Sequence, residues 1–211
     1  MWRPALLAVL SLVPILTRAA APAPLADATA NRHLGFFLRL DGGVGFMGTS
    51  AYIEGLAASV SGVSIPLGVT VGGAVAENLI LAGEAWYILA PTPVFDLGGR
   101  NETASDSGVS LLGAGPNLTY YFMPDNVYVS VTLAIVHRAL RASGTYEASR
   151  VGFGAKIAVG EEWWVSDHWG IGVAAQFFLG LNQGTGIYQK LWTTLGGGMA
   201  FSACGSPFHD P

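Results

Sequence analysis

The chain has 211 residues, of which 51% are apolar and only 11% are charged, about half the usual charged share of soluble domains. The formal net charge is −4, and the absence of a basic run argues against nucleic acid as a partner. Cys204 is the only cysteine, so the sequence excludes an intrachain disulfide.

Residues 1–28 have the features of a cleaved secretory signal peptide. Arg3 supplies a positive start, an apolar run follows from Ala5 to Leu16, and Ala/Pro-rich sequence comes next. The apolar run is too short to cross a bilayer of ~30 Å as a helix. Small-residue sites allow cleavage between 19 and 30, and the stretch 26–30 is favoured. We therefore expect an exported protein.

Eight stretches then alternate apolar and small or polar residues with a period of two, the side-chain repeat of a strand. In the first stretch, Phe36, Leu38 and Leu40 fall on one face, and Arg39 and Asp41 fall on the other. The predicted strands are 34–47, 63–76, 78–90, 109–122, 126–138, 151–165, 168–181 and 190–202. The 29 glycines are poor for helices but suit a narrow barrel with small inward residues.

The connections between these strands alternate in length. Turn-forming residues make short connections at 77–78, 124–126 and 166–168. Longer connections are predicted near 48–62, 91–108, 139–150 and 182–189. Such an asymmetry is typical of bacterial outer-membrane barrels, and an even strand count puts both termini on the periplasmic side. The pattern predicts an all-β, eight-stranded antiparallel up-and-down transmembrane β-barrel over 31–203, followed by a short tail, 204–211.

Two other fold classes compete with the barrel. Residues 55–76 carry no charge and are long enough for a membrane helix, but they contain Pro66 and five glycines, and their valines recur at period two. A soluble β-sandwich also alternates. Against it, the aromatic residues cluster near both ends of the predicted strands, as expected for rings at two lipid interfaces.

Three segments carry a resemblance to a known family. These are 115–122 (GPNLTYYF), 126–130 (NVYVS) and 160–172 (GEEWWVSDHWGIG). The chain resembles the outer membrane beta-barrel domain proteins of Gram-negative bacteria, which are small OmpA/OmpX-like barrels. The resemblance implies export through the periplasm to the outer membrane, with membrane lipid, lipopolysaccharide and the barrel-insertion machinery as partners. One departure is that ten residues follow Phe201, whereas such barrels usually end on an aromatic residue.

Projecting the strands inward places three cations and three carboxylates in one lumen. An eight-stranded barrel is only wide enough for its own side chains, so mutual pairing is expected, with a proton or ion path as the alternative. Bulky inward residues such as Trp86, Phe178 and Tyr121 favour a plugged lumen over a channel. The predicted structural ion-pair network consists of Arg39, Asp41, Glu84, Arg138, Lys156 and Glu162.

The longer connections hold the candidate surface contacts. Arg138, Arg141 and Arg150 form a cluster that could bind lipopolysaccharide phosphates through charge-assisted hydrogen bonds. Scattered charge that solvates the loop is the alternative.

No residue pattern indicates catalysis. His137 has no serine two residues along, and His168 belongs to a predicted tight turn. No spacing indicates a metal site, a phosphate loop or a cofactor. We therefore expect a non-enzymatic protein with a structural or surface-interaction role and an unidentified surface ligand. The alternatives are a small channel for ions or hydrophobic solutes and a lipid-modifying enzyme.

Overall fold

The computed structural model describes residues 33, 35–53, 56–103, 106–142, 144–166, 169–185 and 190–205. The predicted signal peptide, the turn residue His168 and residues 206–211 lie outside them. All regular structure in the described residues is β-strand. The strands are β1 (Phe36–Ile53), β2 (Leu56–Ala76), β3 (Leu79–Ala90), β4 (Val94–Leu97), β5 (Arg100–Thr103), β6 (Ser107–Phe122), β7 (Val127–Ala142), β8 (Thr145–Ala148), β9 (Gly152–Trp164), β10 (Trp169–Gln183) and β11 (Leu191–Gly205).

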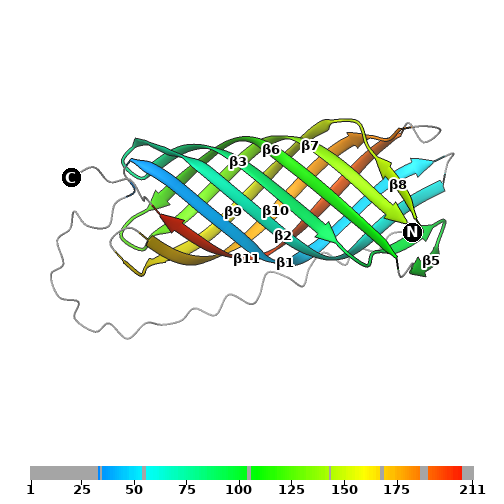
Figure 1. Cartoon of the computed structure of the whole chain (residues 1–211), viewed down its shortest axis with the longest axis horizontal. Helices are drawn as coiled ribbons and strands as arrows, with labels where there is room; N and C mark the ends of the chain where they lie inside the picture. The colour runs from blue at the N-terminus through cyan, green and yellow to red at the C-terminus, as the bar shows by residue number, and fades with distance from the viewer. Residues whose placement is uncertain are drawn as a thin grey trace. The chain divides into compact units, whose positions relative to one another are not determined.

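Eight of these strands close into a ring. Their order is β1, β11, β10, β9, β7, β6, β3 and β2, and the pairing of β1 with β2 completes the circle. Every neighbouring pair is antiparallel, and the strands run obliquely around the ring (Figure 1). The prediction of an eight-stranded antiparallel barrel is confirmed. In the described part of the chain, no helix is long and apolar enough to cross a membrane.

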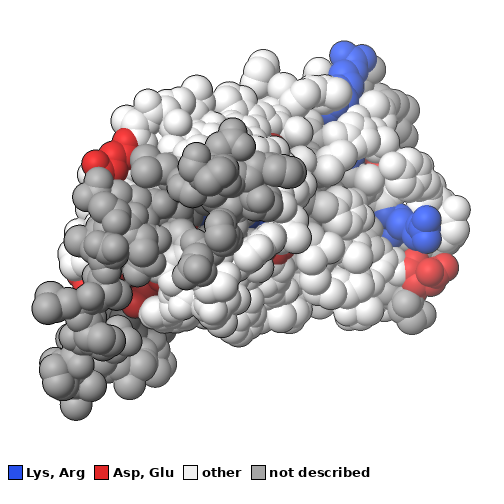
Figure 2. All heavy atoms as spheres, turned by 60° about the vertical axis from the view of Figure 1, so that its left-hand side comes forward, with Lys and Arg blue, Asp and Glu red and all other residues white. Residues whose placement is uncertain are grey.

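The alternation in sequence separates the two faces of the barrel wall. On β2, the side chains of Val63 and Leu67 are 70% and 52% exposed, whereas Ser64 and Thr70 point inward and are buried. On β7, Leu133 and Ile135 face outward in the same way. Most of the surface seen in Figure 2 is uncharged, and its coloured side chains gather near the two ends. A closed ring with such an apolar outer face suits lipid rather than water.

The longer connections differ from the prediction, because much of them is strand. β1 and β2 extend into the predicted loop 48–62 and pair there as far as Ile53 opposite Leu56. Region 91–108 contains β4 and β5, and β4 pairs with the extended part of β2. Region 139–150 contains the end of β7 and its partner β8. β5 and β8 therefore lie at one end of the ring, here called the extended end (Figure 1).

The opposite end, called the short-turn end, carries the tight turns. Asn78 and Asn126 adopt positive φ angles of 62° and 54° there, a conformation that asparagine tolerates better than most residues. The last strand continues to Gly205, so Cys204 belongs to β11 rather than to the predicted tail, and its side chain is buried in the lumen.

Candidate functional site

The lumen at the short-turn end is closed by aromatic rings around His33. This residue precedes β1, and its imidazole stacks on the Tyr121 ring with centroids 3.6 Å apart. The Nε2 atom of His33 donates a hydrogen bond of 2.8 Å to Oδ1 of Asn126. The rings of Phe37 and Trp164 also contact His33. These contacts hold His33, which precedes β1, inside the short-turn end of the barrel.

Lowering the pH is expected to weaken this attachment. Burial lowers the pKa of His33 from its usual value of 6.5, because desolvation disfavours the imidazolium. The folded protein then binds fewer protons than the unfolded chain. The stability that His33 contributes is therefore complete above 6.5 and is lost as the pH falls through the lowered pKa.

The measurement is urea unfolding near pH 7.5 and near pH 5 for the wild type and His33→Gln, which cannot titrate. The wild type should lose more stability on acidification than the variant. Equal losses would contradict this role for His33.

Glu162 lies just inside this closure, and no cation of the described residues forms a salt bridge with it. Its carboxylate accepts hydrogen bonds from the Tyr121 hydroxyl at 2.8 Å and the Ser202 hydroxyl at 3.2 Å. The Cys204 thiol donates to the same carboxylate over 2.9 Å. Glu162 is 1% exposed. Three neutral donors from two strands, β6 and β11, thus hold this charge inside the lumen.

The middle of the lumen contains the ion pairs. The Lys156 ammonium lies 3.5 Å from the Asp41 carboxylate and forms a second salt bridge with Glu84. Glu84 also accepts hydrogen bonds from the Asn117 amide and the Thr132 hydroxyl. The structure therefore brings together three of the six residues of the predicted network, contributed by β1, β3 and β9.

The guanidinium of Arg39 lies between this group and Glu162. Its Nη2 donates to the Ser130 hydroxyl over 3.3 Å, and its Cζ lies 4.6 Å from the centre of the Tyr128 ring. Within the described residues, neither Arg39 nor Glu162 takes part in a salt bridge. One hydrogen bond and cation–π contacts with Tyr128 and Phe37 therefore hold Arg39 in the lumen.

Apolar side chains fill the lumen from the ion pairs toward the extended end. Trp86 and Phe178 are 2% and 4% exposed, and their ring centroids lie 6.1 Å apart. They belong to a buried cluster, called the apolar plug, that consists of Met47, Val60, Trp86, Ile88, Ala90, Val109, Leu111, Ala134, Val136 and Phe178. Apolar rather than charged side chains therefore block this part of the lumen.

The structure separates Arg138 from the other two predicted lipopolysaccharide contacts. Arg138 has no exposed surface, and its Cζ lies 4.4 Å from the centre of the Trp192 ring on β11. The expectation that Arg138 contacts surface lipid is therefore wrong, because its side chain points into the lumen. Arg141 and Arg150 are exposed. No salt bridge in the described residues links Arg138 to the rest of the predicted network.

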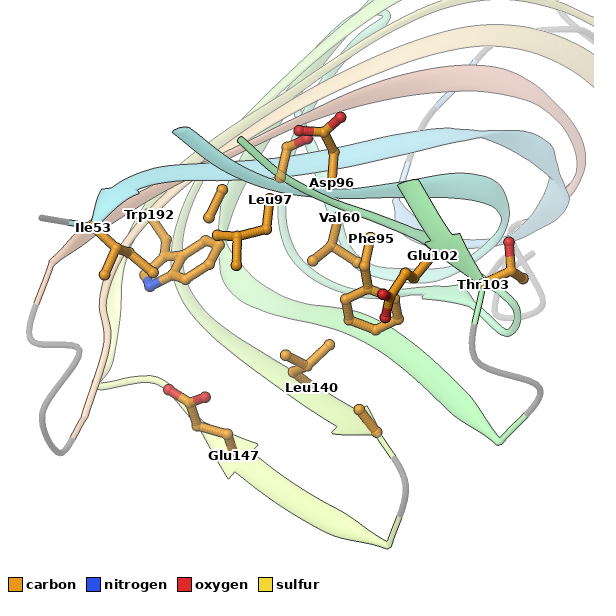
Figure 3. A pocket seen from close by; sticks show the side chains of 13 residues that line it. Ile53, Val60, Phe95, Asp96, Leu97, Glu102, Thr103, Leu140, Glu147 and Trp192 are labelled. Atoms are coloured by element: carbon orange, nitrogen blue, oxygen red, sulfur yellow. The ribbon is translucent and has the colours of Figure 1, made fainter. Parts of the chain in front are cut away.

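A pocket of about 440 Å³ opens at the extended end. Trp192 is one of its lining residues, and Arg138 lies behind the Trp192 ring, covered from the pocket. Its walls come from the β1–β2 hairpin, β4, β5, the β7–β8 hairpin and Trp192. Figure 3 shows Phe95 and Leu140 facing the space, with Glu102 and Glu147 approaching it from opposite sides. The part of the wall from β4, β5 and β8 exists only because the strands continue beyond the ring.

No pattern in the sequence indicates a role for His33, Phe95 or Glu147. His33 lies outside the periodic segments, and no sequence signal places it against Tyr121. Phe95 and Glu147 fall in regions predicted as loops. Trp192 lies on β11, and its contact with Arg138 of β7 spans the lumen.

No protein-family model matches the chain, and no curated protein matches it. Among solved structures, Neisserial surface protein A is similar with a TM-score of 0.56 at 13% identity, over 81% of this chain and 96% of that one. OprG from Pseudomonas aeruginosa aligns over 86% of this chain and 99% of its own at 14% identity, with a TM-score of 0.49. The similarity to Neisserial surface protein A shows that the chain has the fold of the small outer-membrane β-barrels of Gram-negative bacteria, and its closed ring with an apolar outer face fits a lipid bilayer.

Proposed function

We propose that this protein is a non-conducting, non-enzymatic outer-membrane barrel whose function is a surface interaction at its extended end. The observation that carries the proposal is the difference between the two parts of the molecule. Buried side chains occupy the lumen from His33 through Lys156 to the apolar plug. Beyond the plug, the strands rise above the ring and enclose a pocket that faces outward.

The arrangement of polar groups supports a role without catalysis. His33 and His137 are the histidines in the described ranges, and neither hydrogen-bonds a serine, threonine or cysteine side chain there. Glu162 and Cys204 are in contact, but both are enclosed behind the His33 closure. A nucleophile needs a base and access to substrate, and these groups lack access.

The exposed arginines Arg141 and Arg150 extend the proposal to lipid. Both lie on the outside near the extended end, where guanidinium groups can make charge-assisted hydrogen bonds to lipopolysaccharide phosphates. Arg141 also borders a surface hollow of about 370 Å³ together with Tyr87 and Tyr146. Such contacts would hold the barrel among lipid head groups without opening the lumen.

Planar bilayers test the closed lumen. The wild-type protein is expected to show no steady ion conductance, because the apolar plug and the Lys156 ion pairs fill the lumen. The positive control is a double variant, Trp86→Ala with Phe178→Ala, which removes the two largest rings of the plug. A stable wild-type conductance whose ion selectivity changes in Lys156→Met would contradict the proposal and support a channel.

A further inference from the structure

Two buried side chains beneath the pocket at the extended end have donors without acceptors. The Nε, Nη1 and Nη2 atoms of Arg138 have no hydrogen-bond partner among the described residues, and neither does Nε1 of Trp192. The two side chains are 0% and 6% exposed. They lie against each other across the lumen. Four N–H-bearing atoms on two touching side chains thus lack an acceptor in the described part of the chain.

An isolated guanidinium in this position destabilises the fold, because desolvation of a charge is costly unless a partner compensates it. The Trp192 ring offsets part of that cost through its cation–π contact. Glu147 is the nearby carboxylate that interacts electrostatically with Arg138, but the two form no salt bridge. Oε1 of Glu147 is also without a hydrogen-bond partner among the described residues, so the guanidinium and this carboxylate lie near each other without pairing directly.

The walls of the pocket are mainly apolar. Val60, Phe95, Leu97 and Leu140 line the space together with one side of Trp192 (Figure 3). Leu140 is two residues above Arg138 on β7, so the apolar wall begins directly beyond the guanidinium. A volume of about 440 Å³ falls within the usual range of small-molecule sites, ~300–1,000 Å³.

The charges at the rim restrict the anion that this site can take. Glu102 and Glu147 line the pocket, whereas the Asp96 carboxylate points away from it and accepts from the Gly99 N–H. The two glutamates repel every anion, and because this repulsion grows with charge they oppose a doubly charged head group more than a singly charged one. A carboxylate carries a single charge and matches the planar donor fork of a guanidinium with two parallel hydrogen bonds. A phosphate monoester carries more charge and fits this rim less well.

We propose that the pocket binds an aliphatic monocarboxylate, with its head group on Arg138 and Trp192 Nε1 and its hydrocarbon body between Phe95 and Leu140. The inference rests on the proposed surface-interaction function and names the ligand class of that same site. Arg138 contributes the binding charge, and the apolar wall contributes selectivity for a hydrocarbon body over a small polar acid.

Calorimetric titration of the protein purified from its membrane tests the ligand class with octanoate, octylamine and octanol as probes. Protein-free detergent provides the blank. We expect octanoate to bind, and the amine and the alcohol to bind at least about tenfold more weakly, because only the carboxylate satisfies a buried cation. Acetate has the same carboxylate without the long hydrocarbon body, so the difference in affinity between octanoate and acetate measures the contribution of that body.

Arg138→Met provides the decisive variant. Octanoate affinity should fall by at least about tenfold, while the urea midpoint stays unchanged or rises, because the variant replaces an unpaired buried charge by a side chain of similar length. Arg100→Met is the control, since Arg100 is exposed on β5 and is not among the residues that line the pocket. It should leave octanoate affinity unchanged.

Three results would overturn the inference. These are the absence of octanoate binding, unchanged affinity in Arg138→Met, and preferential binding of octylamine that is lost in Glu147→Gln. The last result would show that the acidic rim selects a cation. These outcomes are separate from the bilayer measurement: a closed lumen without octanoate binding rejects only the ligand class, whereas a conducting lumen rejects the proposed function itself.

Discussion

Lys156→Met is expected to lower the free energy of unfolding by about 3–5 kcal/mol, the usual cost of removing one partner from a buried ion pair. Lys156 is 5% exposed and forms salt bridges with both Asp41 and Glu84. Without the ammonium, two carboxylates remain close together in a lumen from which bulk water is excluded. Urea unfolding of the barrel, followed by tryptophan fluorescence, measures the effect.

A second substitution shows whether the loss of stability comes from carboxylates that are left without a cation. Adding Glu84→Gln to Lys156→Met removes one carboxylate and keeps an oxygen that can accept from Asn117. The double variant should be more stable than Lys156→Met alone. Arg100→Met on the exposed strand β5 is the control and should change stability by less than ~0.5 kcal/mol. A loss below about 1 kcal/mol in Lys156→Met would mean that water screens these charges.

Gly198→Ala is expected to destabilise the barrel by at least about 2 kcal/mol, because overpacked positions force the backbone to shift. Gly198 lies on β11 opposite Gly45 of β1, at the contact that joins the last strand to the first. A Cβ atom at Gly198 would overlap the carbonyl oxygen of Val44 and press on Cα of Gly45. Both obstacles are backbone, so no side-chain rotation relieves them.

Gly48→Ala is the matched control. Gly48 lies on β1, in the same pairing of β1 with β11, where it stands opposite Leu195. Its added Cβ would lie 3.6 Å from Cβ of Ser61, an ordinary van der Waals contact. It should leave stability within about 0.5 kcal/mol of the wild type. The measurement combines urea unfolding with gel mobility before boiling, since a closed barrel resists detergent when cold. Equal stability of the two alanine variants would show that the β1–β11 contact tolerates a wider spacing.

The strands of the ring and their two faces follow from the sequence alone. Period two along β2 and β7 is a local property, because successive side chains of any extended strand point to opposite sides. Lipid outside and a narrow lumen inside then require apolar and small or polar residues on those faces. Short turns such as the one at Asn78 are local too. For these reasons the eight ring strands and the inward position of Lys156 were predictable.

The continuation of strands at the extended end was not predictable in this way. Residues 48–62 are mostly small and weakly alternating, since beyond the membrane neither face of the strand must be apolar. Their strand structure depends on pairing between β1 and β2 and between β2 and β4. Such pairing requires partners that the ring has already brought side by side. The walls of the pocket therefore depend on tertiary structure.

The contacts between side chains across the lumen also depend on tertiary structure. The sequence identified Arg39, Glu84, Arg138, Lys156 and Glu162 as inward, but their heights in the lumen depend on how closing the ring staggers the strands. That stagger brings Lys156 to Asp41 and Glu84, leaves Glu162 with neutral donors, and places Arg138 on Trp192. Alternation along a strand determines which face a residue takes, whereas only closure of the ring determines which residue it meets.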